Sequence, residues 1–311
     1  MPSTQEFRRR IKSVNNTRQI TKAMEMIASV KMQKATKTIA AARSYVQNAW
    51  NMLQKLSASV LPDNHPLVSA TKVNKTAVIL ITSDRGLCGG YNAEIIKRFI
   101  RFEKEECACS ITDKKSACGD YSGSCDVIAI GKKGAEYTER YKIGRLIAEF
   151  PAFENDVQIE DIVAISKLTN GEYLAGHYDK VVAIYSHFES SIKQTGVVKQ
   201  ILPLSTNHID KLDLWEADPD LETNNLENFK FEPSPDIVFE GILKQFLRVQ
   251  IFGAILEANA SEHSARMVAM KNATDNAKDL IDELQLIYNS VRQDSITREI
   301  AEISGAAEAM G

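Results

Sequence analysis

The sequence predicts an α/β fold with a Rossmann-like domain between two long terminal helices, which we expect to pair as a long antiparallel coiled coil. Residues 3–61 contain neither proline nor glycine, and residues 236–304 contain no proline and only Gly241 and Gly253. Between these segments, apolar β-branched runs alternate with helical patterns and glycine turns. A helix of about 60 residues would be about 90 Å long, so each terminal helix must lie against the other or against a partner.

A heptad repeat of apolar residues marks both predicted helices. In the first helix the positions alternate at spacings of four and three: Ala35, Ile39, Ala42, Val46, Ala49, Leu53, Leu56 and Val60. Nearer the N-terminus, Ile20, Met24, Ile27 and Ala28 continue an apolar stripe whose phase we expect to slip, as at a stutter. The last helix has a matching repeat: Leu256, Ala260, His263, Met267, Met270, Thr274, Ala277, Ile281, Leu284, Tyr288 and Val291. Two core helices of an ordinary bundle are the alternative, because apolar periodicity alone does not prove a coiled coil.

The charge differs in sign between the two terminal segments. The chain has a net charge of −3, but residues 1–61 carry eleven basic side chains against two acidic ones, whereas residues 236–311 carry seven against twelve. Opposite charge favours pairing of the two helices. Nucleic-acid binding is the alternative for the basic helix, but no aromatic residues interleave with its basic ones between Arg8 and Arg43. We therefore expect no nucleic-acid partner.

The central part of the chain, residues 77–205, has the pattern of an α/β domain. Strands are predicted at 77–83, 126–130, 180–185 and 197–204, and helical stretches at 92–105, after the Gly131–Gly134 turn, and at 157–174. Alternation of strands and helices predicts a layered domain with a largely parallel sheet. Residues 206–235 are acidic and irregular, and we expect them to form a connecting loop before the last helix.

No catalytic or cofactor-binding set is present in the sequence. The turn from Asp84 to Tyr91 lacks the Lys-Ser/Thr pair of a P-loop, and its glycines do not have the dinucleotide-binding spacing. We interpret it as a tight structural turn or a protein contact. Residues 218–222 begin like a calcium loop but lack its central glycine, and the five histidines are too scattered for a zinc site or a triad. The chain is therefore predicted to be non-catalytic, with no cofactor and no metal.

Four of the five cysteines lie close together in a polar segment, about residues 106–125, that has the composition of an insertion: Cys107, Cys109, Cys118 and Cys125. Their spacing is not the paired C-x2-C arrangement of zinc sites, so they are weak metal candidates. Unligated surface thiols and a redox-labile pair are the other two interpretations. Cys88, in the glycine turn, is expected to pack as a small apolar residue.

No uncharged apolar run approaches the roughly 20 residues of a membrane-spanning helix. The first ten residues are polar and basic, without the apolar core of a secretory leader. We expect neither a membrane anchor nor a cleaved leader.

Four sequence strings resemble one family. Residues 10–28, RIKSVNNTRQITKAMEMIA, are similar to the N-terminal helix of the gamma subunit of F-type ATP synthases. The turn SDRGLCGGYN at 83–92 resembles the central glycine turn of that family. Residues 260–277 and 292–302 resemble its C-terminal helix. The strings occur in the family's order and span nearly the whole chain.

The resemblance implies a rotor shaft formed by residues 1–61 and 236–311, turning inside a ring of three alpha and three beta subunits. It implies that the α/β domain lies near the epsilon subunit and the membrane c-ring, so that the chain meets the membrane only through that ring. Proton flow would turn the shaft, and the nucleotide sites would belong to the partner subunits. It places the chain on the cytoplasmic face of a bacterial inner membrane or, alternatively, on the matrix or stroma side of an organelle membrane.

The resemblance also implies contact residues. Met24 is expected near a beta-subunit loop. Polar rotor–stator contacts are expected at Glu262, Arg266, Arg292, Gln293, Thr297 and Glu299, while Asp84 and Arg85 are expected to contact other stalk subunits. The alternative for each is a solvated side chain or a pair within the coil. The tip departs from the family at Ala306 and Glu308. The inserted cysteines cannot be aligned with the redox loop of the chloroplast rotor, and thiol regulation would require reductant or a zinc chelator to change ATPase activity.

Overall fold

The computed structural model describes residues 4–59, 67, 73, 75–107, 125–153, 157–204 and 235–310. Among these, the side chains of residues 43–59, 106–107, 235–236, 239 and 308–310 lie outside the description. The chain divides into two compact units. We call residues 1–30 with 266–311 the helical unit, and residues 31–265 the sheet unit.

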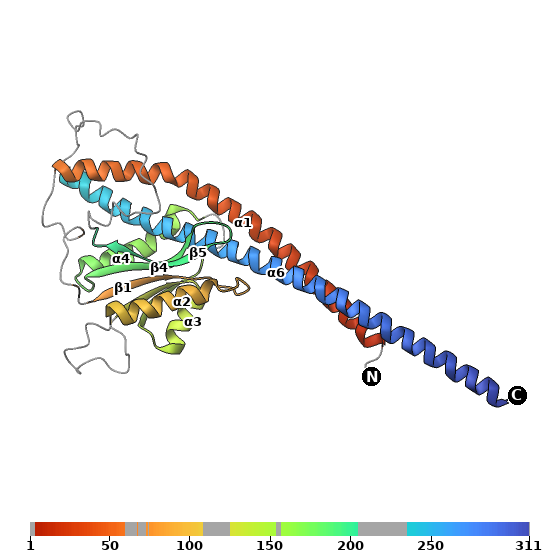
Figure 1. Ribbon diagram of the computed structural model, residues 1–311. Helices are drawn as coiled ribbons and strands as arrows, with labels where there is room; N and C mark the ends of the chain where they lie inside the picture. Colours follow the sequence, from red (N-terminus) through yellow and green to blue (C-terminus); the bar gives the residue numbers. More distant parts are fainter. Residues whose placement is uncertain are drawn as a thin grey trace. The chain divides into compact units, whose positions relative to one another are not determined.

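Two long helices begin and end the described chain (Figure 1). Helix α1 runs from Thr4 to Ser59 and helix α6 from Pro235 to Met310, so each contributes residues to both units. The absence of helix breakers predicted both. Gly241 and Gly253 lie inside α6 with no atom within 4 Å of a Cβ built on either, and the helix continues through them. The predicted long terminal helices are therefore confirmed.

The sheet unit contains a mixed five-stranded sheet in the order β3-β2-β1-β4-β5. Its strands are β1 Thr76–Ile81, β2 Cys125–Ile130, β3 Arg145–Phe150, β4 Lys180–Phe188 and β5 Gln194–Leu202. The first four are parallel, and β5 pairs antiparallel with β4. Four strands were predicted; β3 was not, because its residues alternate between exposed and half-buried on an edge and form no apolar run.

Helices cover both faces of this sheet (Figure 1). The connections are α2 Tyr91–Phe102 with the π-helical turn η1 Glu103–Cys107, α3 Lys132–Tyr141, and the 3₁₀ turn η3 Ile159–Ile162 leading into α4 Val163–Leu174. Helices α2 and α3 lie on one face, and α4 and α6 on the other.

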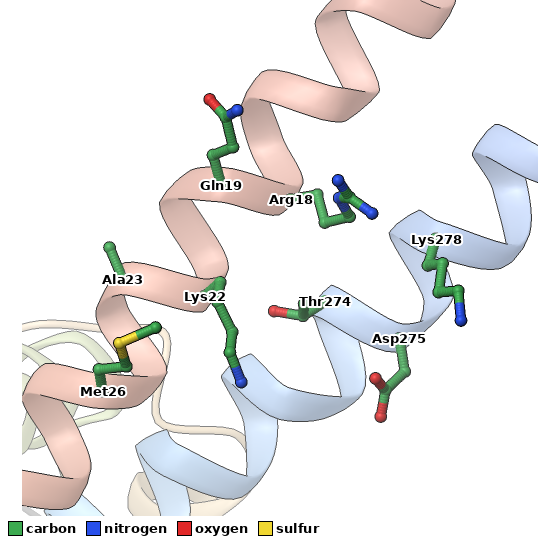
Figure 2. Close-up of a pocket in the computed structure, with 8 residues that line it drawn as sticks. All are labelled: Arg18, Gln19, Lys22, Ala23, Met26, Thr274, Asp275 and Lys278. Carbon is green, nitrogen blue, oxygen red and sulfur yellow. The ribbon is translucent and has the colours of Figure 1, made fainter.

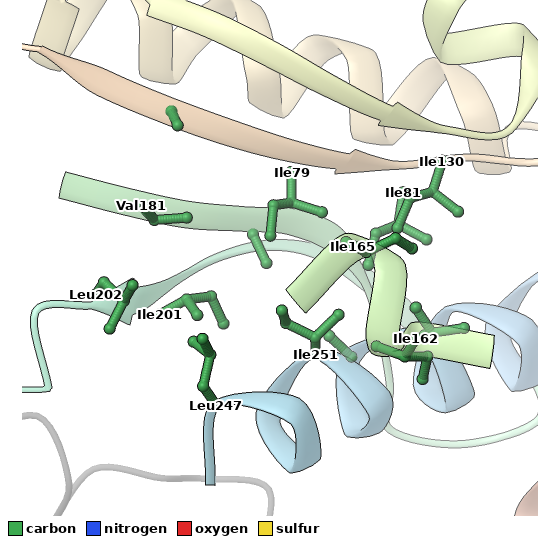
Figure 3. Packing of buried hydrophobic residues seen from close by; sticks show 14 of the residues in the cluster. Ile79, Ile81, Ile130, Ile162, Ile165, Val181, Ile201, Leu202, Leu247 and Ile251 are labelled. Atoms are coloured by element: carbon green, nitrogen blue, oxygen red, sulfur yellow. The ribbon is translucent and has the colours of Figure 1, made fainter. Parts of the chain in front are cut away.

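The larger core lies between the sheet, α4 and α6. Figure 3 shows Leu247 and Ile251 of α6 pointing toward Ile201 and Val181 of the sheet, and Ile165 of α4 beside them. All five side chains are at most 1% exposed. Burying each contributes roughly 1.5–3 kcal/mol, so α6 is a core element of the sheet unit.

A second core fills the opposite face, where the amphipathic α2 places Ile95 and Phe99 against Val78 and Leu80 of β1. The turn after β2 is tightly packed on this side. Gly131 has φ +97°, and a Cβ there would lie 2.2 Å from the Thr82 carbonyl oxygen. Only glycine fits at this position.

Burial along α1 in the helical unit corrects one sequence expectation. Seven of the half-buried and buried positions alternate at spacings of four and three without a break: Phe7, Ile11, Val14, Arg18, Thr21, Glu25 and Ala28. Met24, assigned above to the stripe, is half-buried beside them. Ile20 and Ile27, assigned above to the stripe, are 61% and 58% exposed. The expected stutter is therefore wrong. Ile20 and Ile27 belong to a second stripe, which faces outward and is offset by one residue from the half-buried Thr21 and the buried Ala28.

Several sequence expectations lie outside the described residues: the acidic loop at 206–235, almost entirely, and the thiols Cys109 and Cys118. The same holds for the side chains of Cys107, of Glu308 and of the heptad positions from Val46 to Val60.

Candidate functional site

The edge of the sheet where a doubly wound fold usually binds its ligand is occupied by α6. The strand order reverses direction between β1 and β4, and ligands of such folds bind at the carboxyl ends of the strands at this switch point. Here the Tyr91 hydroxyl, at the start of α2, donates to the Ala258 carbonyl (3.2 Å), and the Ser261 hydroxyl donates to the Ser186 carbonyl at the end of β4 (2.9 Å). The position of α6 disfavours a nucleotide at this edge.

The turn after β1 is held by its own hydrogen bonds. The Ser83 hydroxyl donates to the Arg85 carbonyl (2.7 Å) and accepts from the Asn92 amide (2.7 Å). The same Asn92 side chain accepts from the Ser83 backbone N–H (3.1 Å). Leu87 and Gly89 have φ values of 64° and 58°, so the loop turns through left-handed backbone. These bonds favour the interpretation as a tight structural turn.

Asp84 has a role within the sheet unit. Its carboxylate accepts from the backbone N–H of Lys132 (2.9 Å), at the first turn of α3, and from that of Ala152 (3.2 Å), just beyond β3. A negative charge at a helix N-terminus is favourable. Arg85 is exposed and also takes part in interactions within the chain.

We call residues 257–264 of α6 the α6 joint. They make several hydrogen bonds to strands and loops of the sheet unit, to which they also belong. The Asn259 amide donates to the Phe153 carbonyl (2.7 Å) beyond β3. The Ser264 hydroxyl donates to the Ser191 carbonyl (2.6 Å) in the β4–β5 hairpin. Buried polar groups need partners, and these bonds fix the helix in one position on the sheet edge.

Glu257 is the charged member of the joint, with a side chain only 5% exposed. Its Oε2 lies 2.8 Å from His187 Nδ1 on β4. This hydrogen bond raises the pKa of the His187 imidazole above 6.5, although burial opposes it. Burial raises the pKa of the Tyr185 phenol well above 10, with a further contribution from its hydrogen bond to Glu257. Burial also lowers the pKa of the Lys199 ammonium to about 8, against the attraction of Glu257.

In the helical unit, α1 and α6 lie side by side (Figure 2). Thr274 Oγ1 on α6 is 2.8 Å from Thr21 Oγ1 on α1. A groove of about 430 Å³ lies beside this pair. It is lined by Arg18, Gln19, Lys22, Ala23, Met26, Thr274, Asp275 and Lys278.

The outward faces of the helical unit carry exposed apolar side chains. On α1, Ile20, Ile27 and Val30 share one face at heptad-like spacing and are 58–66% exposed. On α6, Ile296, Ile300 and Ile303 are spaced by four and three and are 47–65% exposed. Every residue described from Arg292 to Ala307 is exposed. Aligned exposed isoleucines on a helix indicate a surface that a partner covers.

The structure places the predicted contact residues in different environments. Arg292, Gln293, Thr297 and Glu299 lie on the exposed end of α6, whereas Met24 is half-buried on α1. Two others face inward: Glu262 is 8% exposed and Arg266 is half-buried, and both take part in interactions within the chain.

The thiol candidates do not form a described site. Cys125 is the first residue of β2 and is 1% exposed, so it belongs to the core rather than to the surface. The side chains of the other three lie outside the described residues. Among the described residues, no group of three or more His, Cys, Asp or Glu side chains could hold a metal ion. Cys88 is buried, as expected.

Sequence reasoning missed the α6 joint. His187 was regarded only as one of several scattered histidines, and Glu257 was not singled out. The available signal was the concentration of polar residues in the last helix, Asn259, Ser261, Glu262 and Ser264, around the heptad positions Ala260 and His263. Within the described part of the chain, no helix is long and apolar enough to cross a membrane.

Comparison with known proteins gives the family. A family model described as ATP synthase matches residues 3–310. The ATP synthase gamma chain of Roseiflexus castenholzii is 36% identical, with 100% of this chain and 99% of that one covered. The gamma chain of Staphylococcus saprophyticus is 34% identical over the full length of both.

Two solved structures share the fold. A chain of the central stalk and c-ring of the Tetrahymena thermophila mitochondrial ATP synthase matches 82% of this chain and 99% of its own length, with a TM-score of 0.56 and 24% identity. A chain of the Euglena gracilis mitochondrial ATP synthase matches 99% and 94%, with a TM-score of 0.64 and 16% identity. The family model and the full-length relatives show that the chain belongs to the ATP synthase gamma chain family.

Proposed function

We propose that this chain is the central rotor shaft of an F-type ATP synthase. In this proposal it couples proton-driven rotation of the membrane c-ring to conformational change at the beta subunits, for ATP synthesis or hydrolysis. The observation that carries the proposal is the match to ATP synthase gamma chains along the entire chain. The similar folds in central-stalk and rotor structures support it.

The shaft itself is proposed to be an antiparallel coiled coil of residues 1–61 with 236–311. In an antiparallel pair, each step forward along α1 from Thr21 matches a step backward along α6 from Thr274. Ala28 is then opposite Met267, and Val14 is opposite Ile281. In the helical unit this counting produces seven pairs: Phe7–Tyr288, Ile11–Leu284, Val14–Ile281, Arg18–Ala277, Thr21–Thr274, Glu25–Met270 and Ala28–Met267. Every member is buried or half-buried, which is the expectation for a heptad seam.

The same counting leaves the end of α6 without an α1 partner. Thr4 would lie opposite Val291, and the residues that follow are all exposed through Ala307. A lone helix of this length gains little stability in water and here presents Ile296, Ile300 and Ile303 on one face. An apolar sleeve formed by other subunits would cover that face. We propose the alpha and beta subunits, three of each, as that sleeve.

Stator contacts are assigned to the exposed predicted residues Arg292, Gln293, Thr297 and Glu299 on α6, and also to the half-buried Met24 on α1. Glu262 and Arg266 are proposed to contact the stator in addition to their interactions within the chain. In the sheet unit, Arg85 is the exposed candidate for contact with the epsilon subunit or c-ring, because the Asp84 carboxylate already accepts backbone hydrogen bonds.

Catalysis is assigned to the partner subunits. In support, α6 occupies the edge of the sheet where related architectures bind nucleotides. The chain is proposed to be peripheral, on the cytoplasmic face of a bacterial inner membrane, and to reach the membrane only through the c-ring. The matrix or stroma side of an organelle membrane is the alternative.

The test is assembly. Expressed with alpha and beta subunits of an F-type ATP synthase, the chain should co-purify at one copy per three alpha–beta pairs, measured by native mass spectrometry. Absence of a complex, or a different ratio, would reject the proposal.

A variant pair tests the apolar face of α6. Ile296→Ser combined with Ile300→Ser should weaken assembly by about tenfold or more, because each buried isoleucine contributes roughly 1.5–3 kcal/mol. Arg298→Ser, on the same exposed helix, is the matched control and should assemble normally. Equal assembly of both variants would show that the isoleucines are not at the interface.

A further inference from the structure

The polar cluster beneath the α6 joint has no role in the proposed rotor contacts. It consists of Glu257 on α6, Tyr185 and His187 on β4, and Lys199 on β5. Glu257 is 4% exposed and Tyr185 1%, while His187 and Lys199 are half-buried. An acid, two bases and a phenol at a buried helix–sheet contact are costly unless their charges are matched.

We propose that this cluster is a protonation-sensitive latch that fixes the α6 joint to β4 and β5 and loosens as the pH rises. The geometry carries the inference: one carboxylate on the helix meets one imidazole on the strand at 2.8 Å, and both belong to the sheet unit. The inference does not rest on the rotor function.

Protonated His187 carries the positive charge that matches Glu257. The other charged groups facing this imidazole are Glu189 in the β4–β5 hairpin, which raises its pKa, and Lys199 on β5, which lowers it. Glu189 is itself bonded to Lys193 and Thr195. The hydrogen bond with Glu257 is the largest cause of the raised pKa of His187.

The direction of the pH effect follows from that shift. A histidine whose pKa is raised by folding stabilises the folded contact fully below its unfolded value of about 6.5, and this stabilisation is lost as the pH rises through the folded value. When His187 loses its proton, the hydrogen bond to Glu257 can remain but its ionic part disappears.

Lys199 acts in a separate pH range. Its pKa is lowered to about 8, so the folded state favours its neutral form, and its contribution to stability increases with pH above that value. A measurement that stays below about pH 8 therefore reports mainly on His187.

The chain contains a matched control pair. His177 Nδ1 lies 2.7 Å from Glu172 Oε2, but these side chains are 63% and 38% exposed, compared with 24% and 5% for His187 and Glu257. Exposed pairs of this kind contribute about 0–1 kcal/mol to folding stability, and this one does not attach α6 to the sheet.

The experiment is hydrogen–deuterium exchange of the full chain, with protection of residues 251–264 corrected for the intrinsic pH dependence of exchange. Between about pH 6 and 7.5, protection should fall by roughly three- to tenfold in the unmodified chain. His187→Gln should abolish this pH dependence, and His177→Gln should retain it. No fall in the unmodified chain, or the same fall in His187→Gln, would overturn the latch.

A second measurement covers the case in which His187→Gln does not fold. The imidazole of His187 can be titrated by NMR in the unmodified chain and assigned by single substitution of the other four histidines. A midpoint above 6.5, with chemical shifts of residues 251–264 following the same curve, supports the latch. A midpoint at or below 6.5, or shifts that follow another curve, contradicts it.

Discussion

Two regions of α6 with the same secondary structure have opposite environments. Residues 254–258 and 260–264 are all buried, and Ser261 and Ser264 among them donate hydrogen bonds to backbone carbonyls at the end of β4 and in the β4–β5 hairpin. Residues 292–307 are all exposed, although they include Ile296, Ile300 and Ile303. Thus the buried region contains many polar residues and the exposed region contains aligned apolar ones. This inversion teaches that the first region fixes the helix within its own chain, whereas the second leaves apolar side chains exposed, which we propose are covered by a surface outside the chain.

Introducing a charged side chain should give the largest difference between the two regions in the free energy of unfolding. Ala258→Asp places a carboxylate at a site that is 1% exposed, and we expect a loss of about 3–5 kcal/mol in the free energy of unfolding. Ala301→Asp, at an exposed site, should change it by less than about 0.5 kcal/mol. Urea unfolding of both variants measures the difference. Similar losses would mean that the end of α6 is packed within the chain.

Truncating one buried and one exposed isoleucine of α6 gives the next largest contrast in the free energy of unfolding. Ile251→Ala leaves a cavity in the core between α6 and the sheet and should cost about 2–5 kcal/mol. Ile300→Ala should cost less than about 0.5 kcal/mol in the isolated chain, because Ile300 is 58% exposed. Thermal and urea unfolding would show a clear midpoint shift for Ile251→Ala alone. A comparable shift for Ile300→Ala would contradict the comparison.

The paired part of the helical unit should show an intermediate change in the free energy of unfolding. Thr274→Ala removes the hydroxyl that donates to Thr21, and we expect a cost of about 1 kcal/mol. Thr297→Ala removes an exposed hydroxyl on the same helix and should be nearly neutral. Exchange protection of residues 18–28 would report the loss locally. If both variants behave alike, the threonine pair does not hold the helices.

The last contrast concerns the pH dependence of the buried region. Because burial lowers the pKa of Lys199 to about 8 while the unfolded value is about 10.4, folding stability should increase with pH between these values. Lys199→Met should remove that increase, measured as the slope of unfolding midpoint against pH. Lys193→Met, at the exposed end of the hairpin, should leave the slope unchanged. An unchanged slope in Lys199→Met would exclude this lysine as its source.

Much of the fold was predictable because its signals are local. The absence of proline and the scarcity of glycine predict α1 and α6, and the run at residues 77–82 predicts a strand buried on both faces. The edge strand β3 escaped prediction because Arg145 and Glu149 interrupt its apolar residues. The functional assignment came from the family resemblance, since no catalytic pattern is present to identify.

The sequence by itself therefore determined the long helices, the α/β character of the centre, and the family. Tertiary structure decided which faces are buried. Residues 20 and 27 and residues 21 and 28 have the same seven-residue spacing, so periodicity alone cannot choose between the stripes; packing buries Ala28 and leaves Ile20 and Ile27 exposed. Only the fold brings His187 to Glu257, 70 residues further along, and fills the switch point with α6. The physical reason is that helix formation depends on neighbours in sequence, whereas burial and charge pairing depend on neighbours in space.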